Sequence, residues 1–205
     1  MLEWYKDQIG LKAQTNNQGN VWLSLMNEAQ SSPPGANGIF FLPHFNGTTS
    51  PTLDPRSLGA FLGLNDTTRK EDMIRAVIEG LNYSFLDMLK ALELGAGREA
   101  EEITCIGGGT RNDFWMQNKA DVAGRPVVTL EIEEATALGA AILAGVGVGV
   151  YNNLKEAAER IHKPGRLFEP DMKLSSFYTE LFEIYREIHP TLERINSRIY
   201  NRFRV

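Results

Sequence analysis

The hydrophobic positions along the chain follow two patterns, one typical of amphipathic helices and one typical of short buried strands. The clearest helix is predicted over residues 71–92, where apolar residues recur at steps of three and four and form one face. Thr68 and Glu71 are expected to form a capping box at its start, and Gly95 lies near its expected end. Because glycine lowers helix stability, Gly80 inside this helix predicts close packing of another backbone.

The following section changes to short apolar runs that are separated by glycines. Strands are predicted over residues 103–106 and 127–130, with a glycine turn and a helix over 112–123 between them. A helix of small residues over 135–143 is expected to be buried and packed tightly on a sheet, since small side chains let backbones approach closely. The order of strand, glycine turn, helix, strand and helix predicts an α/β fold.

The remaining elements lie toward the two ends of the chain. A long irregular loop over residues 43–59 has few apolar residues, and loops of this length are more often functional than neutral. Pro190 is expected to kink or split the last helix. The other predicted elements are a strand over 39–42 and helices over 21–29, 154–161 and 177–203.

Composition narrows the class of protein without indicating its chemistry. The 205 residues include 42% apolar and 23% charged residues, which is typical of a globular protein, and the length favours a single domain over residues 1–205. The net charge of −5 argues against a nucleic-acid partner. The single Cys105 cannot form an internal disulfide and fits a cytoplasmic location. The longest uncharged apolar run, 135–150, has 16 residues and falls short of the roughly 20 that span a bilayer, so no membrane partner is expected.

The glycines at positions 107, 108 and 109 form the first candidate binding site. A strand that ends in glycines before a helix places bare backbone N–H groups beside the helix N-terminus, an arrangement that favours phosphate. A tight turn that binds nothing is the alternative, and the spacing alone leaves both open. Asn112 follows; it either caps the next helix, which is the favoured role, or donates a hydrogen bond to a nucleotide.

The spacing of the histidine, acidic and cysteine residues along the sequence indicates no catalytic site and no metal site. His44, His162 and His189 are far apart in the sequence and lack the spacing of metal ligands. Asp54 before a proline is typical of a turn, and no two carboxylates form a pair suited to acid–base catalysis. Cys105 and the three tryptophans are expected in the core. We therefore predict no catalytic and no metal-ligating residue in this chain.

Four stretches, taken in order, resemble the C-terminal half of the FGGY carbohydrate kinases, the family of xylulose, glycerol and gluconate kinases. The strongest runs from Gly59 to Glu79, where Gly-Ala-Phe-Leu-Gly-Leu is followed seven residues later by Asp-Met-Ile-Arg-Ala-Val-Ile-Glu. It is similar to the C-terminal signature of the family. The others are residues 41–59, residues 107–121 with Gly-Gly-Gly-Thr-Arg-Asn at their start, and residues 134–141; a weaker fifth stretch is 168–171.

The resemblance implies an actin-like ATPase lobe with a ribonuclease-H-like fold that lacks its first strands. It also implies ATP with Mg²⁺ as the phosphate donor, bound mainly by this lobe. Matched position by position, Gly108 and Asn112 fall on nucleotide contacts of the family, with Gly107 and Gly109 beside them. Glu3 stands where some members carry a glutamine that contacts the nucleotide.

The resemblance also implies what the chain does not supply. The sugar-binding N-terminal lobe and its catalytic aspartate have no counterpart here, so the chain is expected to be the ATP-binding half of a sugar kinase and inactive alone. Xylulose is the favoured sugar, with glycerol or gluconate as alternatives. A non-catalytic nucleotide-binding or interaction module, or a remnant that binds nothing, is also left open. Missing strands would expose a sheet edge, which predicts either a homodimer or an edge covered by residues 177–203.

Overall fold

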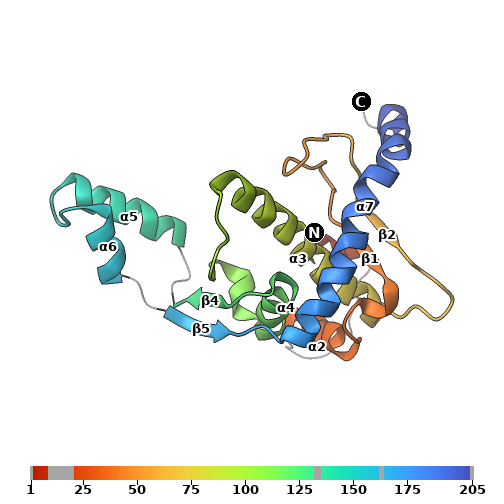
Figure 1. Ribbon diagram of the computed structural model, residues 1–205, viewed down its shortest axis with the longest axis horizontal. Coiled ribbons are helices and arrows are strands. Elements are labelled where there is room, and N and C mark those ends of the chain that lie inside the picture. The colour runs from red at the N-terminus through yellow and green to blue at the C-terminus, as the bar shows by residue number, and fades with distance from the viewer. Residues whose placement is uncertain (1, 9–20, 132–134, 162–163, 204–205) are drawn as a thin grey trace.

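The computed structural model describes residues 2–8, 21–131, 135–161 and 164–203 (Figure 1). Helices and strands alternate along the chain, as the α/β prediction requires. Before the glycine turn, the elements are α1 (Leu2–Gln8), α2 (Val21–Ser31), β1 (Phe40–Leu42), β2 (Ala60–Leu62) and α3 (Lys70–Ala96). Around and after the turn they are β3 (Ile103–Cys105), α4 (Asp113–Ala123), β4 (Val127–Leu130), α5 (Ala135–Gly147), α6 (Leu154–Ile161), β5 (Pro164–Phe168) and α7 (Met172–Phe203).

Two small sheets organise the described residues. β1 pairs antiparallel with β2, which places Phe41 opposite Phe61. In the second sheet β4 lies between β3 and β5; it runs parallel to β3 and antiparallel to β5. Helix α4 makes the crossover between the parallel strands, as predicted. Neither β2 nor β5 is predicted from the sequence, because β2 is only three half-buried residues long and β5 begins with Pro164 and Gly165.

The long helix α3 forms the centre of the larger core. Its apolar face buries Ile74, Val77 and Ile78 completely, and the helix packs against α2, β1, α4 and α7. The predicted capping box is wrong in its residues: Thr68 closes a turn with Asn65, and the helix begins after Arg69, whose N–H donates to the Asp72 carboxylate. The helix ends at Ala96, next to Gly95 as predicted, with Gly97 as its C-cap.

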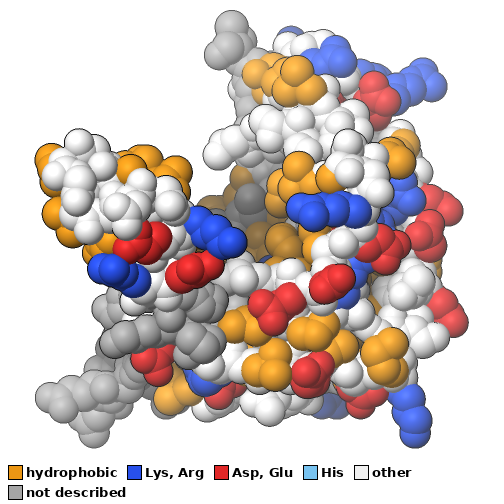
Figure 2. Space-filling model, turned by 60° about the vertical axis from the view of Figure 1, so that its left-hand side comes forward, with side chains coloured by type: hydrophobic (Ala, Val, Ile, Leu, Met, Phe, Trp, Pro, Cys, Tyr) orange, Lys and Arg blue, Asp and Glu red, His pale blue; other side chains and the backbone are white. Residues whose placement is uncertain are grey.

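Helix α5 differs from the prediction that it would be buried. It packs against α6 at one end of the molecule (Figure 1), and no side chain described in α5 is buried. Leu143 is 62% exposed, and Val148 just beyond the helix is 78% exposed. Figure 2 shows hydrophobic side chains spread over this end of the molecule. The small residues of α5 therefore do not pack on a sheet among the described residues.

The C-terminal helix α7 is continuous across Pro190, so the expected split does not occur. Its main contacts are with α3, α4 and β1, a strand of the two-stranded sheet. The prediction of a homodimer, or of a sheet edge covered by residues 177–203, stays a prediction. No helix in the described ranges is long and apolar enough to cross a membrane.

Candidate functional site

A cavity of about 700 Å³ lies where the glycine turn faces α1, α2 and α3. Gly108, Gly109 and Asn112 line it from the turn, and Trp115 lines it from α4. Glu3, nearly 110 positions away in the sequence, lines the same cavity from α1. The wall from α2 and α3 is mostly apolar and consists of Trp22, Leu23, Met26 and Leu81. Three of the four predicted site residues and the weaker candidate Glu3 therefore share one cavity.

The glycine turn presents bare backbone. Gly107 has φ 91°, a conformation that favours glycine, and it starts a 3₁₀ turn over Gly108–Arg111. The turn is closed by Thr110, whose N–H and hydroxyl both donate to the Gly107 carbonyl, at 3.0 and 2.7 Å. A Cβ built on Gly107 or Gly108 would meet no atom within 4 Å. A flat or charged ligand can therefore approach this backbone closely.

Asn112 is the N-cap of α4, as the sequence favoured. Its Oδ1 accepts a hydrogen bond from the backbone N–H of Trp115 at 2.8 Å. Gly124 ends the same helix with φ 64°. Capping uses the oxygen of the Asn112 side-chain amide. The NH₂ group of the same side chain, which lines the cavity, can donate a hydrogen bond to a ligand. Capping and ligand contact are thus compatible at this position.

A second hollow of about 440 Å³ lies on another side of the same turn. Gly107 lines this hollow and not the larger cavity, whereas Gly108 and Arg111 line both. Arg166 on β5 borders it, forms an ion pair with Asp113 and donates to the Thr110 carbonyl. No pattern in the sequence points to Arg166, because the pattern predicts no strand at β5.

The prediction that the tryptophans lie in the core holds in part for Trp22 and Trp115, which pack against the buried core, and is wrong for Trp4. Trp22 and Trp115 are half-buried and line the cavity. Trp4 is 39% exposed and makes an edge contact with Phe45 at 4.7 Å between ring centroids. The spacing of aromatic residues along a helix does not tell whether they lie in the core or in a cavity wall. Here the position of the glycine turn, which faces Trp22 and Trp115, makes them part of the cavity wall.

The structure brings together two of the histidines that are distant in sequence. The rings of His44 and His189 lie 5.3 Å apart, His44 Nδ1 is 2.8 Å from the Ser57 hydroxyl, and His189 Nε2 is 3.2 Å from Asp54. Burial, together with the neighbouring His189, lowers the pKa of His44 to about 4. Asp54 also accepts from the Arg56 N–H, as expected for a turn residue. His162 lies outside the described residues, and within those described no group of three or more His, Cys, Asp or Glu is placed to hold a metal.

Comparison with known proteins decides the family. Residues 1–148 match the description "FGGY family of carbohydrate kinases, C-terminal domain". The chain belongs to this family. An FGGY relative named xylulose kinase, from Staphylococcus epidermidis, is 34% identical over 196 residues, which is 96% of this chain and 38% of the relative. Glycerol kinase 1 of Clostridium tetani is 40% identical over 151 residues, 74% of this chain and 30% of the relative.

A solved FGGY structure gives the fold. The crystal structure of ligand-bound xylulose kinase from Lactobacillus acidophilus superimposes with a TM-score of 0.85 at 27% identity, covering 96% of this chain and 38% of that one. The chain therefore has the actin-like fold of an FGGY kinase C-terminal half, as the sequence predicted. It spans less than half the length of the FGGY relatives it matches.

Proposed function

We propose that this chain is the nucleotide-binding part of an ATP-dependent sugar kinase and that the cavity at the glycine turn is the nucleotide site. The observation that carries the proposal is that Gly108, Asn112 and Glu3 line one cavity. The resemblance to the family motifs supports the proposal independently of the cavity, because Gly108 and Asn112 fall on positions that contact the nucleotide in the family. Membership in a kinase family supports the same assignment.

The chemistry of the cavity fits a nucleoside phosphate. Its apolar and aromatic wall, which includes Trp22 and Trp115, suits a purine ring. The NH₂ group of Asn112 can donate to the nucleoside, and the backbone of Gly107–Gly109 can lie against sugar or phosphate without a Cβ between them. Mg²⁺ would be held chiefly by the phosphates, as is usual for nucleotide-bound magnesium.

The whole enzyme would transfer the γ-phosphoryl group of ATP to a sugar hydroxyl. Such transfer requires both substrates to be positioned and the developing charge to be neutralised. We propose that residues 1–205 form one domain, and that the sugar site and the catalytic base belong to the part of the relatives' length that this chain does not span. The chain alone is then inactive, and a coupled assay with ATP and xylulose should show no ADP production above background.

Xylulose is the proposed acceptor because a relative that is 34% identical over 96% of this chain is a xylulose kinase. The 40% identity to a glycerol kinase makes glycerol the second candidate, and gluconate remains an alternative. A cytoplasmic location is proposed with this metabolic role. The homodimer stays a prediction, which light scattering on the purified chain would measure.

Calorimetric titration with Mg-ADP tests the nucleotide site. The wild-type chain should bind saturably, and Gly108→Leu should abolish binding, because its side chain would enter open space at the cavity without straining the backbone. Gly139→Leu makes the same change on α5, also where a Cβ meets nothing within 4 Å, and should bind like wild type. Absence of binding by the wild-type chain at millimolar Mg-ADP would contradict the proposal and favour a turn that binds nothing.

A further inference from the structure

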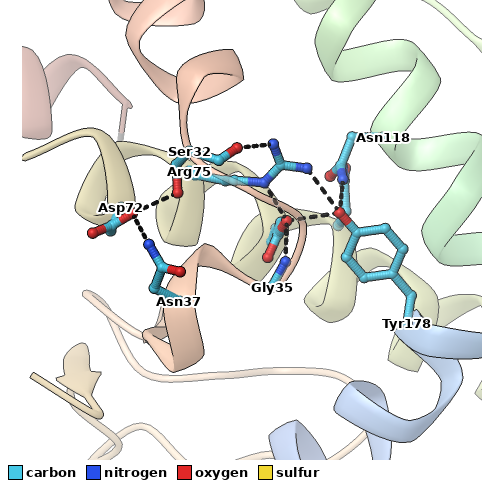
Figure 3. Close-up of polar contacts among 9 residues, drawn as sticks. Ser32, Gly35, Asn37, Asp72, Arg75, Asn118 and Tyr178 are labelled. Carbon is cyan, nitrogen blue, oxygen red and sulfur yellow. Dashed lines mark hydrogen bonds and ion pairs between the residues drawn. The ribbon is translucent and has the colours of Figure 1, made fainter. Parts of the chain in front are cut away.

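A continuous chain of buried hydrogen bonds leads from the cavity wall into the core. The indole Nε1–H of Trp115 donates to Asn82 Oδ1 at 3.1 Å, and Asn82 Nδ2 donates to Asn118 Oδ1 at 2.7 Å. Asn118 Nδ2 donates to the Tyr178 hydroxyl at 2.8 Å, and that hydroxyl donates to Glu79 at 2.7 Å. Figure 3 shows Tyr178 from α7 meeting Asn118 and the Arg75 guanidinium at the end of this chain.

The indole of Trp115 fixes the direction of these hydrogen bonds, because an indole N–H can only donate. Asn82 and Asn118 must therefore each accept through the side-chain oxygen and donate through the side-chain nitrogen. The Tyr178 hydroxyl accepts from Asn118 and from the Arg75 guanidinium, so it donates its own hydrogen to Glu79. Burial raises the pKa of Tyr178, so its hydroxyl keeps the proton that it donates. Hydrogen bonds aligned head to tail in this way polarise and strengthen one another.

The carboxylate end of the chain is held from several sides. Glu79 Oε1 accepts from Arg75 Nε at 2.7 Å and from the Gly35 N–H at 3.1 Å, in addition to the Tyr178 hydroxyl. Arg75 also donates to the Tyr178 hydroxyl at 3.0 Å. Asn82 and Tyr178 have no exposed surface, and Asn118 is 3% exposed. The series of hydrogen bonds thus ends on the Glu79 carboxylate of α3, which is buried and accepts from three donors.

Trp115, at the other end of this series of hydrogen bonds, supports the proposed nucleotide site. The Trp115 ring packs against Gly109, where a Cβ would lie 3.1 Å from Trp115 Cζ3. The backbone N–H of the same tryptophan holds the Asn112 side chain. Movement of the Trp115 indole would therefore disturb both the glycine turn and Asn112, which line one cavity.

We propose that Asn82, Asn118 and Tyr178 are positioning residues for the nucleotide cavity, which they serve by fixing the Trp115 indole. The inference rests on the proposed function, because the cavity matters only if it binds nucleotide. It assigns a role in ligand binding to Tyr178 on α7, a helix that contributes no residue to the cavity wall among those described. Removing the hydrogen bonds of the Tyr178 hydroxyl should make the Trp115 indole more mobile, while every residue that lines the cavity stays in place.

Tyr178→Phe tests the proposal, and Tyr83→Phe is its matched control. Both rings are buried in the same aromatic cluster, with centroids 6.3 Å apart, but the buried Tyr83 hydroxyl has no hydrogen-bond partner among the described residues. The first readout is the ¹⁵N–¹H signal of the Trp115 indole and its hydrogen exchange, assigned with Trp115→Phe. The second is Mg-ADP affinity by calorimetry. The Trp4 indole, which lies on α1 outside the cavity lining and packs against Phe45, serves as the internal reference for the spectrum.

We expect Tyr178→Phe to shift the Trp115 indole signal, to accelerate its exchange, and to weaken Mg-ADP binding about three- to ten-fold. Tyr83→Phe should leave both readouts at wild-type values, and the Trp4 signal should stay unchanged in both variants. An unchanged Trp115 signal and affinity in Tyr178→Phe would overturn the proposal, and so would equal effects in Tyr83→Phe.

Two further outcomes remain informative. If the wild-type chain does not bind Mg-ADP, the proposed function fails, and the Trp115 signal alone decides whether Tyr178 positions the indole. If Tyr178→Phe does not fold, Asn118→Leu is the second variant. It removes the hydrogen bonds that Asn118 makes to Asn82 and Tyr178, and it is compared with wild type by the same two readouts. An unchanged indole signal in Asn118→Leu would overturn the inference.

Discussion

Gly80, in the middle of α3, lies directly against the backbone carbonyl oxygen of Phe41 in β1. A Cβ on Gly80 would overlap that oxygen, so only glycine lets the helix approach the strand this closely. The contact matters beyond these two residues, because α3 also carries Glu79 and Asn82, which take part in the hydrogen-bond chain to the cavity. The prediction of a close backbone contact at Gly80 is confirmed.

Gly80→Ala should destabilise the protein, although alanine is the better helix former. The new methyl group must push two backbones apart, and overpacking of this kind costs about 1–3 kcal/mol. Urea unfolding should therefore show a lower free energy of unfolding. Gly95→Ala in the same helix is the control: its Cβ meets nothing within 4 Å, so it should raise stability by about 0.5–1 kcal/mol. Equal effects of the two changes would contradict the packing argument.

Removing one partner of the buried Arg75–Glu79 ion pair should be costly. Arg75→Met leaves the Glu79 carboxylate buried without its cation, which typically costs about 3–5 kcal/mol. The double variant Arg75→Met/Glu79→Met removes both charges and should lose less than the single variant. Lys70→Met, also on α3, breaks an exposed ion pair with Glu28 of α2 and should cost less than about 1 kcal/mol. Urea unfolding of all three variants measures the comparison.

Stability should fall in mild acid because of His44. In the folded state its pKa is lowered from 6.5 to about 4 by burial and by the neighbouring His189, while Asp54 nearby opposes the shift. A histidine that stays neutral in the fold but is protonated when unfolded stabilises the fold above pH 6.5, and this contribution is lost as the pH falls toward 4. His44→Asn can still hydrogen-bond to Ser57 and should lose less stability between pH 7 and pH 5. Parallel losses in wild type and variant would contradict this assignment.

The two roles of Asn112 can be separated by two substitutions. Asn112→Ala removes the cap of α4 and should lower the free energy of unfolding by about 1 kcal/mol. Asn112→Ser keeps a capping oxygen, so its stability should stay within a few tenths of a kcal/mol of wild type. Both variants lose the amide NH₂ group and should bind Mg-ADP more weakly. Wild-type affinity in Asn112→Ser would show that the amide serves only as a cap.

The sequence by itself determined the elements whose signals are local. The apolar face of 71–92, the strands at 39–42, 103–106 and 127–130, and the helix after the glycine turn are all present with small shifts at their ends. Glycine turns and asparagine caps act through bonds to residues only a few positions away, so Gly107 and Asn112 could be placed before any tertiary contact was known. The family was identifiable for the same reason, since its motifs are contiguous stretches of chain.

Only the tertiary structure decided which distant residues share a site. Glu3, Trp22 and Leu81 reach the glycine turn because α1, α2 and α3 pack around it, and no periodicity in the sequence encodes that meeting. The hydrogen-bond chain from Trp115 to Tyr178 joins three helices whose polar residues look ordinary in sequence. The prediction that α5 is buried is wrong, because an apolar sequence shows that a helix surface is apolar but not which other element covers it.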